Sequence, residues 1–219
     1  MQKRQIEKRR ERMIALIDYD AGNLKSVEKA LQLIGQEVCV TRNPEEILSA
    51  DKVILPGVGC FKDAMDNLHR FGLVSVIKKV VERKIPLLGI CLGLQLLFEK
   101  SEESPGVEGL GILAGEVCRI PSAPGLKIPH MGWNNLSFPN KGRLFENMEE
   151  NSYVYFVHSY YLRAKDEDIV TAKTEYGVSI HASVEKDNIF ACQFHPEKSS
   201  HVGLQILRNF AAISQEGGR

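Results

Sequence analysis

The chain has 219 residues, of which 43% are hydrophobic and 26% charged, and its formal net charge is zero. This composition is typical of a globular protein, and the lack of net charge excludes a long-range field that would recruit nucleic acid or an anionic membrane. No apolar run approaches the roughly 18 residues of a membrane span. The length fits one domain with a sizeable core.

The first twelve residues differ from the rest in charge. They carry six Lys or Arg and two Glu, a net charge of +4 that leaves −4 for residues 13–219. Because they contain no apolar segment, they do not form a secretory signal. We interpret residues 1–12 as a disordered or helical extension and residues 13–219 as a single domain. The five cysteines show no C-x-x-C spacing, which favours a reducing, cytoplasmic setting over a disulfide framework or a zinc site.

The first hundred residues alternate short apolar runs with amphipathic stretches. Strands are expected at residues 13–19, 37–41, 53–55 and 86–90, and helices at residues 24–34, 61–82 and 92–100. Phe71-Gly72 predicts a break in the second helix. Strands that are apolar throughout predict a parallel sheet with helices on both faces.

The second half is richer in strands. Strand-like runs occur at residues 116–120, 133–138, 153–162, 169–174, 178–184 and 189–193, and a helix is expected over 200–213. These runs predict antiparallel additions and the remaining strands of the sheet. The sequence therefore predicts a three-layer, flavodoxin-like α/β fold whose central sheet is mostly parallel.

A cysteine between two glycines stands where a strand is expected to pass into a helix. In Gly89-Ile-Cys91-Leu-Gly93 the glycines allow a tight turn that would present Cys91 above the sheet. The N-terminus of the following helix favours a thiolate and offers N–H groups to an oxyanion. This pattern alone leaves two readings open, a nucleophile and a small structural residue.

Two further strand ends bear on this choice. In His195-Pro-Glu197 the proline fixes the backbone, and residues two apart in an extended segment face the same way, so that Glu197 can orient the imidazole of a general base. Pro56-Gly57-Val58-Gly59 contains glycines that allow a peptide N–H to turn towards an oxyanion. In open α/β sheets the carboxyl ends of strands carry the ligand site.

Together these motifs, with Gln95 one helical turn after Cys91, resemble those of the triad-type (class I) glutamine amidotransferases. The resemblance covers the chain from Met13. It implies catalysis by Cys91, His195 and Glu197, and an oxyanion hole formed by Leu92 with the loop Gly57, Val58 and Gly59. It also implies that the amino acid part of glutamine is held by Gly59, Gln95, Glu103, His158, Ser159 and Tyr160. No metal and no cofactor are expected.

Other segments narrow the resemblance within this class. The runs 129–134, 155–160 and 195–200, and Pro-Gly-Val-Gly in place of Pro-Gly-Gly, are similar to the glutaminase subunits of imidazole glycerol phosphate synthase in histidine biosynthesis. The resemblance implies a heterodimer with a (β/α)₈-barrel cyclase subunit that receives the ammonia. The interface residues that we expect are Asn23, Trp133, Tyr155 and Lys198, with a core aromatic as an equally good reading of Trp133.

The sequence leaves two alternatives open. One is a glutaminase that serves another synthase, such as one that makes anthranilate, aminodeoxychorismate, pyridoxal phosphate or guanylate, and the other is a non-catalytic regulatory subunit. One further hypothesis concerns Val58, whose β-branched side chain resists positive φ. It predicts an oxyanion hole that is mis-set at rest and completed only when the partner holds its ligand.

Overall fold

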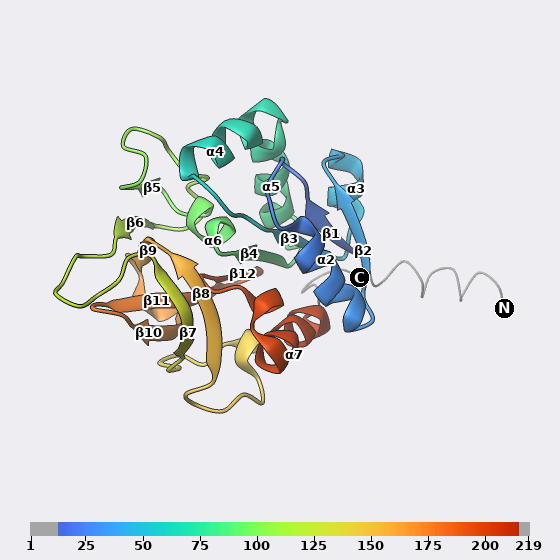
Figure 1. Cartoon of the computed structure of the whole chain (residues 1–219). Helices are drawn as coiled ribbons and strands as arrows, with labels where there is room; N and C mark the ends of the chain where they lie inside the picture. Colours follow the sequence, from blue (N-terminus) through green and yellow to red (C-terminus); the bar gives the residue numbers. More distant parts are fainter. Residues whose placement is uncertain (1–12, 215–219) are drawn as a thin grey trace.

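A seven-stranded sheet forms the centre of the protein in the computed structural model, which describes residues 13–214 (Figure 1). The extension expected at residues 1–12 lies outside the described residues. The strands follow the spatial order β10-β11-β12-β4-β3-β1-β2. From β12 to β2 all neighbours are parallel, whereas β10 and β11 are antiparallel. The bounds are β1 Met13–Ile17, β2 Glu37–Thr41, β3 Lys52–Leu55, β4 Leu87–Ile90, β10 Val170–Glu175, β11 Ser179–Lys186 and β12 Ile189–Cys192.

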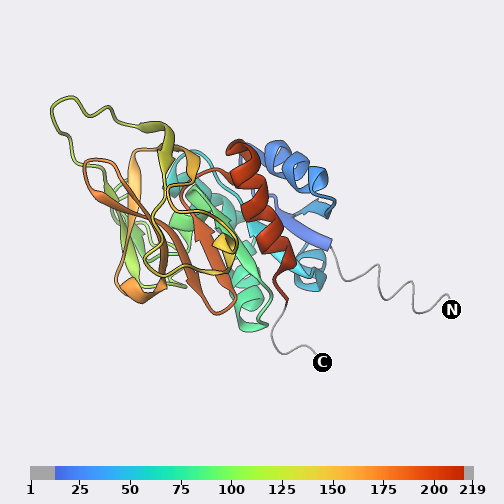
Figure 2. The same ribbon diagram turned by 90° about the horizontal axis from the view of Figure 1, so that it is seen from below.

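Helices cover both faces of this sheet. Helices α2 (Leu24–Leu33) and α7 (Ser200–Ala212) lie together on one face, as Figure 2 shows, and pack on the buried side chains of Leu16, Ile54 and Leu88. Helices α3 (Pro44–Ser49), α4 (Phe61–Arg70) and α5 (Leu73–Glu82) cover the other face. These three layers confirm the predicted mostly parallel α/β fold, and the break at Phe71-Gly72 between α4 and α5 is also where it was expected.

Two smaller sheets stand beside the central one. One contains β5 (Lys100–Ser101), β6 (Gly115–Arg119) and β9 (Tyr160–Ala164), and the other is the hairpin of β7 (His130–Asn135) and β8 (Tyr153–His158). The single strand expected over residues 153–162 is therefore two strands. The chain changes partner at Ser159, because His158 pairs with His130 whereas Tyr160 pairs with Arg119. Short 3₁₀ turns span Arg143–Phe145 (η1), Glu167–Ile169 (η2) and Pro196–Lys198 (η3).

Two helices differ from the sequence prediction. The helix expected over residues 92–100 is α6 and ends at Leu96. Its next carbonyl groups bind another segment instead, since Leu110 donates to the Leu96 carbonyl at 2.8 Å and Ile112 to the Leu97 carbonyl at 3.0 Å. Helix α3 was not anticipated, although Asn43 caps it by accepting from the amide of Glu45 at 2.8 Å.

The carboxyl ends of four neighbouring strands meet at one edge of the sheet. Strand β12 leads to His195, β4 to Cys91, β3 to the Gly57–Gly59 loop and β1 to Asn23. The parallel arrangement thus gathers segments that are up to 172 residues apart in sequence, which is the usual origin of a ligand site in such a sheet. Within residues 13–214 no helix is long and apolar enough to cross a membrane.

Candidate active site

Cys91 occupies a strained turn between β4 and α6. Its φ is 53°, in the region that L-residues rarely adopt, and its amide donates to the carbonyl of Cys192 at 2.8 Å. The turn brings backbone segments into close contact. A Cβ on Gly93 would lie 1.9 Å from the Leu55 carbonyl oxygen, and one on Gly89 would lie 2.8 Å from the Gly93 oxygen. Only glycine fits at either position, so the backbone itself fixes the place of the sulfur.

His195 and Glu197 form a buried pair on the adjacent strand end. The two atoms His195 Nδ1 and Glu197 Oε1 are 2.7 Å apart, and the side chains are only 1% and 0% exposed. Burial by itself lowers the pKa of His195, but the interactions with Cys91 and Glu197 outweigh it and raise the pKa to about 10. Asn23 donates from Nδ2 to the same carboxylate oxygen at 2.6 Å. The imidazole is therefore oriented and held in its charged form at neutral pH.

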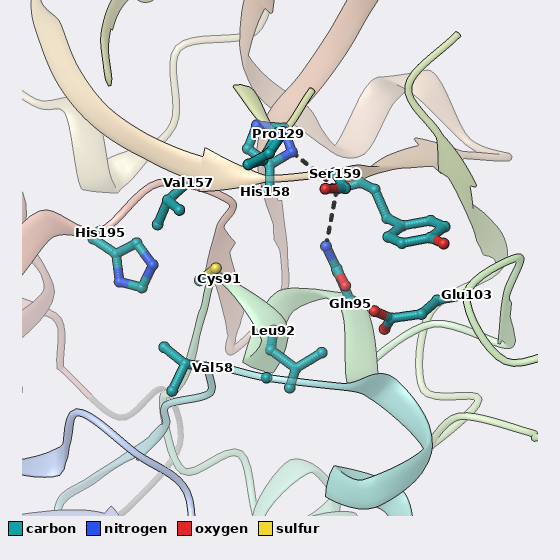
Figure 3. Close-up of a pocket in the computed structure, with 12 residues that line it drawn as sticks. Val58, Cys91, Leu92, Gln95, Glu103, Pro129, Val157, His158, Ser159 and His195 are labelled. Carbon is teal, nitrogen blue, oxygen red and sulfur yellow. Dashed lines mark hydrogen bonds between the residues drawn. The ribbon is translucent and has the colours of Figure 1, made fainter. Parts of the chain in front are cut away.

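Cys91 and His195 face each other across a cavity of about 320 Å³ (Figure 3). His195 Nε2 is buried and has no hydrogen-bond partner among the described residues, which leaves it free for the sulfur or a reactant. A cysteine, a histidine and a carboxylate in this order are the groups that nucleophilic catalysis at a carbonyl requires. The structure thus brings together the three residues that the sequence singled out from two distant motifs.

The Gly57–Gly59 loop forms the wall of the cavity opposite the β7–β8 hairpin. Gly59 has a φ of 101°, whereas Val58 keeps out of the positive-φ region and is 37% exposed. The amide of Leu92 donates to the carbonyl of Gly57 at 3.3 Å. One of the two N–H groups expected to form the oxyanion hole is thus engaged by a loop carbonyl in this conformation.

The other expected substrate-binding residues line the same cavity. Gln95, Glu103, His158 and Ser159 contribute to its wall (Figure 3), and so does Tyr160. Gln95 Nε2 donates to the Tyr160 carbonyl at 3.0 Å, and Glu103 Oε2 accepts from the amide of Phe61 at 2.8 Å. Carboxylate and amide oxygens at this end suit the ammonium group of an amino acid.

Two buried histidines, His130 and His158, are paired at this wall. His130 Nδ1 and His158 Nε2 are 3.1 Å apart, and His158 Nδ1 lies 2.9 Å from the Tyr160 carbonyl. Burial lowers the pKa of His158 to about 3 and that of His130 to about 4. Sequence reasoning assigned no role to His130. Its pairing with His158 follows from the register of the hairpin, which the sequence does not reveal.

The residues expected at a protein interface have different surroundings. Trp133 is 52% exposed and contacts Tyr155 edge to face, with ring centroids 6.1 Å apart, so the core reading of Trp133 is wrong. Lys198 is exposed at η3. Asn23 instead turns its amide inward to Glu197. Met131 was not among the expected residues, but it is 63% exposed and lies on the same face of β7 as Trp133.

Sequence reasoning also missed Gln193. This side chain is fully buried beside Cys91 and lies two residues before His195. The rule that groups His195 with Glu197, residues two apart facing the same way, would have found it. No group of three or more His, Cys, Asp or Glu residues in the described part of the chain has the arrangement of a metal site.

Comparison with known proteins identifies the family. The family of glutamine amidotransferases class I matches residues 15–213. The chain belongs to this family. Among solved structures, the crystal structure of a glutamine amidotransferase aligns with a TM-score of 0.71 at 21% identity, covering 91% of this chain and 99% of that one. The structure of PurLQS from Thermotoga maritima gives a TM-score of 0.69 at 21% identity, over 91% of this chain and 97% of that one. These similarities show the amidotransferase fold.

Closer relatives place the chain within the amidotransferases. The imidazole glycerol phosphate synthase subunit HisH of Moorella thermoacetica is 54% identical over 94% of this chain and 98% of its own length. HisH of Methanocaldococcus jannaschii is 50% identical over 92% of this chain and its whole length. HisH of Thermosynechococcus vestitus is 52% identical over 93% and 98%. This amidotransferase is therefore a member of the HisH family.

Proposed function

We propose that this chain is the glutaminase subunit of an imidazole glycerol phosphate synthase. It would hydrolyse glutamine to glutamate and pass the ammonia to a (β/α)₈-barrel cyclase subunit in histidine biosynthesis. The observation that carries the proposal is the buried His195–Glu197 pair facing Cys91 in one cavity. The names of the HisH relatives support the choice of synthase.

The first half of the reaction uses the ion pair of Cys91 and His195. The thiolate attacks the side-chain amide carbon of glutamine, and the carbonyl oxygen takes up the negative charge. His195 then gives the Nε2 proton to the amide nitrogen, the C–N bond breaks, and ammonia leaves a γ-glutamyl thioester on Cys91. Glu197 keeps the ring oriented through Nδ1, and Asn23 holds the carboxylate.

The second half runs through the same groups in reverse roles. His195 takes a proton from water, whose oxygen attacks the thioester carbon. The C–S bond breaks, its electron pair returns to the sulfur, and glutamate leaves. Gln95, Glu103 and the His158–Tyr160 segment would hold the amino acid part of the substrate throughout, because they line the far end of the cavity.

The resting loop supports the hypothesis of a partner-dependent oxyanion hole. The amide of Leu92 binds the Gly57 carbonyl, so an oxyanion would have to displace this carbonyl to reach it. We expect the cyclase subunit, when it holds its nucleotide, to stabilise a loop conformation in which that amide and a peptide N–H of the Gly57–Gly59 loop point into the cavity. The Trp133–Tyr155 pair is within the surface expected to meet that subunit, and the exposed side chain of Val58 belongs to the loop that would change conformation.

Glutamate release tests this function directly. We would measure it for the chain alone, with a cyclase subunit of an imidazole glycerol phosphate synthase, and with that subunit plus its ribonucleotide substrate. We expect low turnover alone and a strong increase with both. Turnover that is equal with and without the partner would refute the loop hypothesis, and no turnover under any condition would refute the glutaminase itself.

Two controls separate the alternatives. A partner subunit from anthranilate synthase, supplied with its own acceptor, tests whether another synthase accepts the chain, and we expect no activation by it. Labelling of Cys91 with an electrophilic glutamine analogue tests for a non-catalytic subunit. An unlabelled Cys91 in the presence of the cyclase and its nucleotide would favour that reading.

A further inference from the structure

A buried amide contacts the nucleophile from the side opposite the solvent. Gln193 follows β12, its side chain is 0% exposed, and it has no part in the chemistry described above. Its Nε2 donates to Cys91 Sγ at 3.7 Å, and its Oε1 accepts from Gln95 Nε2 at 3.0 Å. We propose that Gln193 is a further catalytic residue, whose side-chain amide holds the Cys91 thiolate and links it to Gln95. This inference rests on the proposed function of the Cys91 site.

A backbone carbonyl fixes which end of each amide faces which neighbour. Gln95 must place its nitrogen next to the Tyr160 carbonyl, because a carbonyl oxygen only accepts. The same nitrogen then requires the oxygen of Gln193, so the nitrogen of Gln193 must face the sulfur. An inverted Gln193 would set nitrogen against nitrogen. These contacts therefore fix the orientation of both side-chain amides, and the two possible orientations of Gln193 are not equivalent.

The Tyr160 carbonyl also fixes the histidine pair. It accepts from His158 Nδ1, so His158 Nε2 has to accept from His130 Nδ1. His130 Nε2 then accepts from Asn134, at 3.4 Å, on the exposed hairpin. The Tyr160 carbonyl therefore anchors two series of hydrogen bonds. One runs through the two histidines, and the other runs through Gln95 and Gln193 to the sulfur of Cys91. This anchoring leaves Gln193 little freedom to turn away from Cys91.

The titratable groups around Cys91 explain what an amide adds. Burial raises the pKa of Tyr19 and Cys192, and burial lowers the pKa of His158, so all three are uncharged at neutral pH. His195 is the charged neighbour, with Glu197 behind it. Gln193 is an additional donor, and one that does not titrate. A hydrogen bond to a charged sulfur is stronger than one between neutral groups.

The second half of the reaction is where this donor matters most. When water attacks the thioester, His195 takes the water proton and is not available as a new donor until the transfer is under way. The electron pair of the breaking C–S bond then collects on the sulfur. Gln193 Nε2 is already in place to stabilise that charge, without reorganisation at the moment of reaction.

The substitution Gln193→Met removes the donor and keeps an unbranched side chain of similar size. We would alkylate the glutamine-free protein with iodoacetamide at neutral pH and follow Cys91 by peptide mass spectrometry. Cys39 and Cys60, both partly exposed, give an internal reference in the same digest. We expect alkylation of Cys91 to slow about tenfold, the ultraviolet thiolate absorbance to fall, and, with the cyclase subunit present, kcat to fall while KM changes little.

The control is Ser183→Ala on the neighbouring strand. Ser183 is also 0% exposed and donates to the Ala191 carbonyl at 2.7 Å, but it does not contact the cavity. This variant should lose thermal stability by an amount comparable to Gln193→Met and alkylate Cys91 at the wild-type rate. If both variants slow alkylation equally, Gln193 acts only through stability and the inference fails.

A second variant keeps the test decisive if Gln193→Met does not fold. Gln193→Glu retains the oxygen that Gln95 needs and replaces the donor nitrogen by an oxygen. At alkaline pH, where the carboxyl is ionised, we expect slower alkylation of Cys91 than in the wild type, and wild-type reactivity would overturn the inference. Alkylation needs no glutamine, so a wild-type chain that alkylates but releases no glutamate would refute the proposed function and not this contact.

Discussion

Two buried histidines line the same cavity with opposite charge states. His195 and His158 are both almost inaccessible to solvent, yet the pKa of the first is raised to about 10 and that of the second is lowered to about 3. Burial lowers the pKa in both cases. The difference comes from the partners. His195 is hydrogen-bonded to Glu197 and faces Cys91, whereas His158 contacts a backbone carbonyl and the neutral ring of His130.

This difference shows that location does not decide what a histidine can do. A carboxylate at 2.7 Å supplies the charge that makes an imidazolium stable in a dry site. A carbonyl fixes a tautomer but cannot compensate a full positive charge. His195 is therefore suited to transfer protons, whereas His158 is suited to a structural role in the cavity wall.

The largest effect is expected when the charged partner of His195 is replaced by an uncharged one, so that its surroundings resemble those of His158. In Glu197→Gln an amide replaces the carboxylate, so the pKa of His195 falls and the imidazole loses its orientation. We expect glutaminase turnover with the cyclase subunit to fall about 10³-fold, in the range of losses for a general base and its orienting carboxylate. Turnover and a histidine NMR titration measure the two effects together.

The control for this change is Glu167→Gln, which removes an exposed carboxylate paired with Lys173 at 2.9 Å. Its turnover should match the wild type, because exposed ion pairs contribute little.

The raised pKa of His195 also stabilises the wild type below pH 6.5, and this contribution is lost as pH rises towards 10. An unchanged alkaline stability profile in Glu197→Gln would contradict the origin that we assign to the shift.

A smaller effect is expected on the acid side. The pKa values of His130 and His158 lie below the 6.5 of an exposed imidazole, so the unfolded chain binds more protons and stability falls with pH below about 6.5. In His130→Phe one such group is removed, and the new ring can stack between Phe156 and Tyr176. We expect the loss of unfolding free energy between pH 7 and pH 5 to be smaller by about 1–2 kcal/mol.

Chemical denaturation at the two pH values measures this difference, and His69→Gln provides the matched variant. His69 is exposed on α4, so its removal should leave the pH dependence as it is in the wild type. A His130→Phe profile that runs parallel to the wild type would mean that the pair is already protonated or solvated in the folded protein.

The smallest effect concerns the residue that holds Glu197. Asn23→Ala removes the 2.6 Å hydrogen bond to Glu197 Oε1 but leaves the carboxylate next to His195. We expect kcat to fall about fivefold, the size of one hydrogen bond to a partly compensated charge. Turnover with the cyclase saturating, measured beside the Kd of the complex, separates the two roles of Asn23. A change in the Kd alone would show that Asn23 acts at the interface with the cyclase subunit and not in the active site.

The sequence was sufficient for the parts that depend on local pattern. Apolar runs and glycines located the strands of the parallel sheet, and the spacing of His195, Pro196 and Glu197 predicted a pair that the structure brings together. It placed Cys91 at a strand end because only a tight turn needs glycine on both sides. The family motifs then connected the separate pieces.

What the sequence could not supply was the register of distant segments. Helix α6 is short because residues 109–113 bind its last carbonyl groups, and the sequence of residues 92–100 does not indicate this. The His130–His158 pair depends on how two strands of a hairpin align. The orientation of the Gln95 and Gln193 side-chain amides depends on the Tyr160 carbonyl, which belongs to a third segment. Each is a non-local contact whose formation the local pattern does not encode.

Strand β12 has a consequence for how the protein becomes active during its synthesis. It is the last strand within residues 13–214, yet it inserts between β11 and β4 and pairs with β4, the strand that leads to Cys91. The ribosome completes Cys91 about a hundred residues before His195, and the two meet only when the sheet closes around β12. A chain that ends before β12 therefore lacks His195 and Glu197 beside Cys91. The three groups of the triad therefore stand together only in a chain whose β12 has taken its place beside β4.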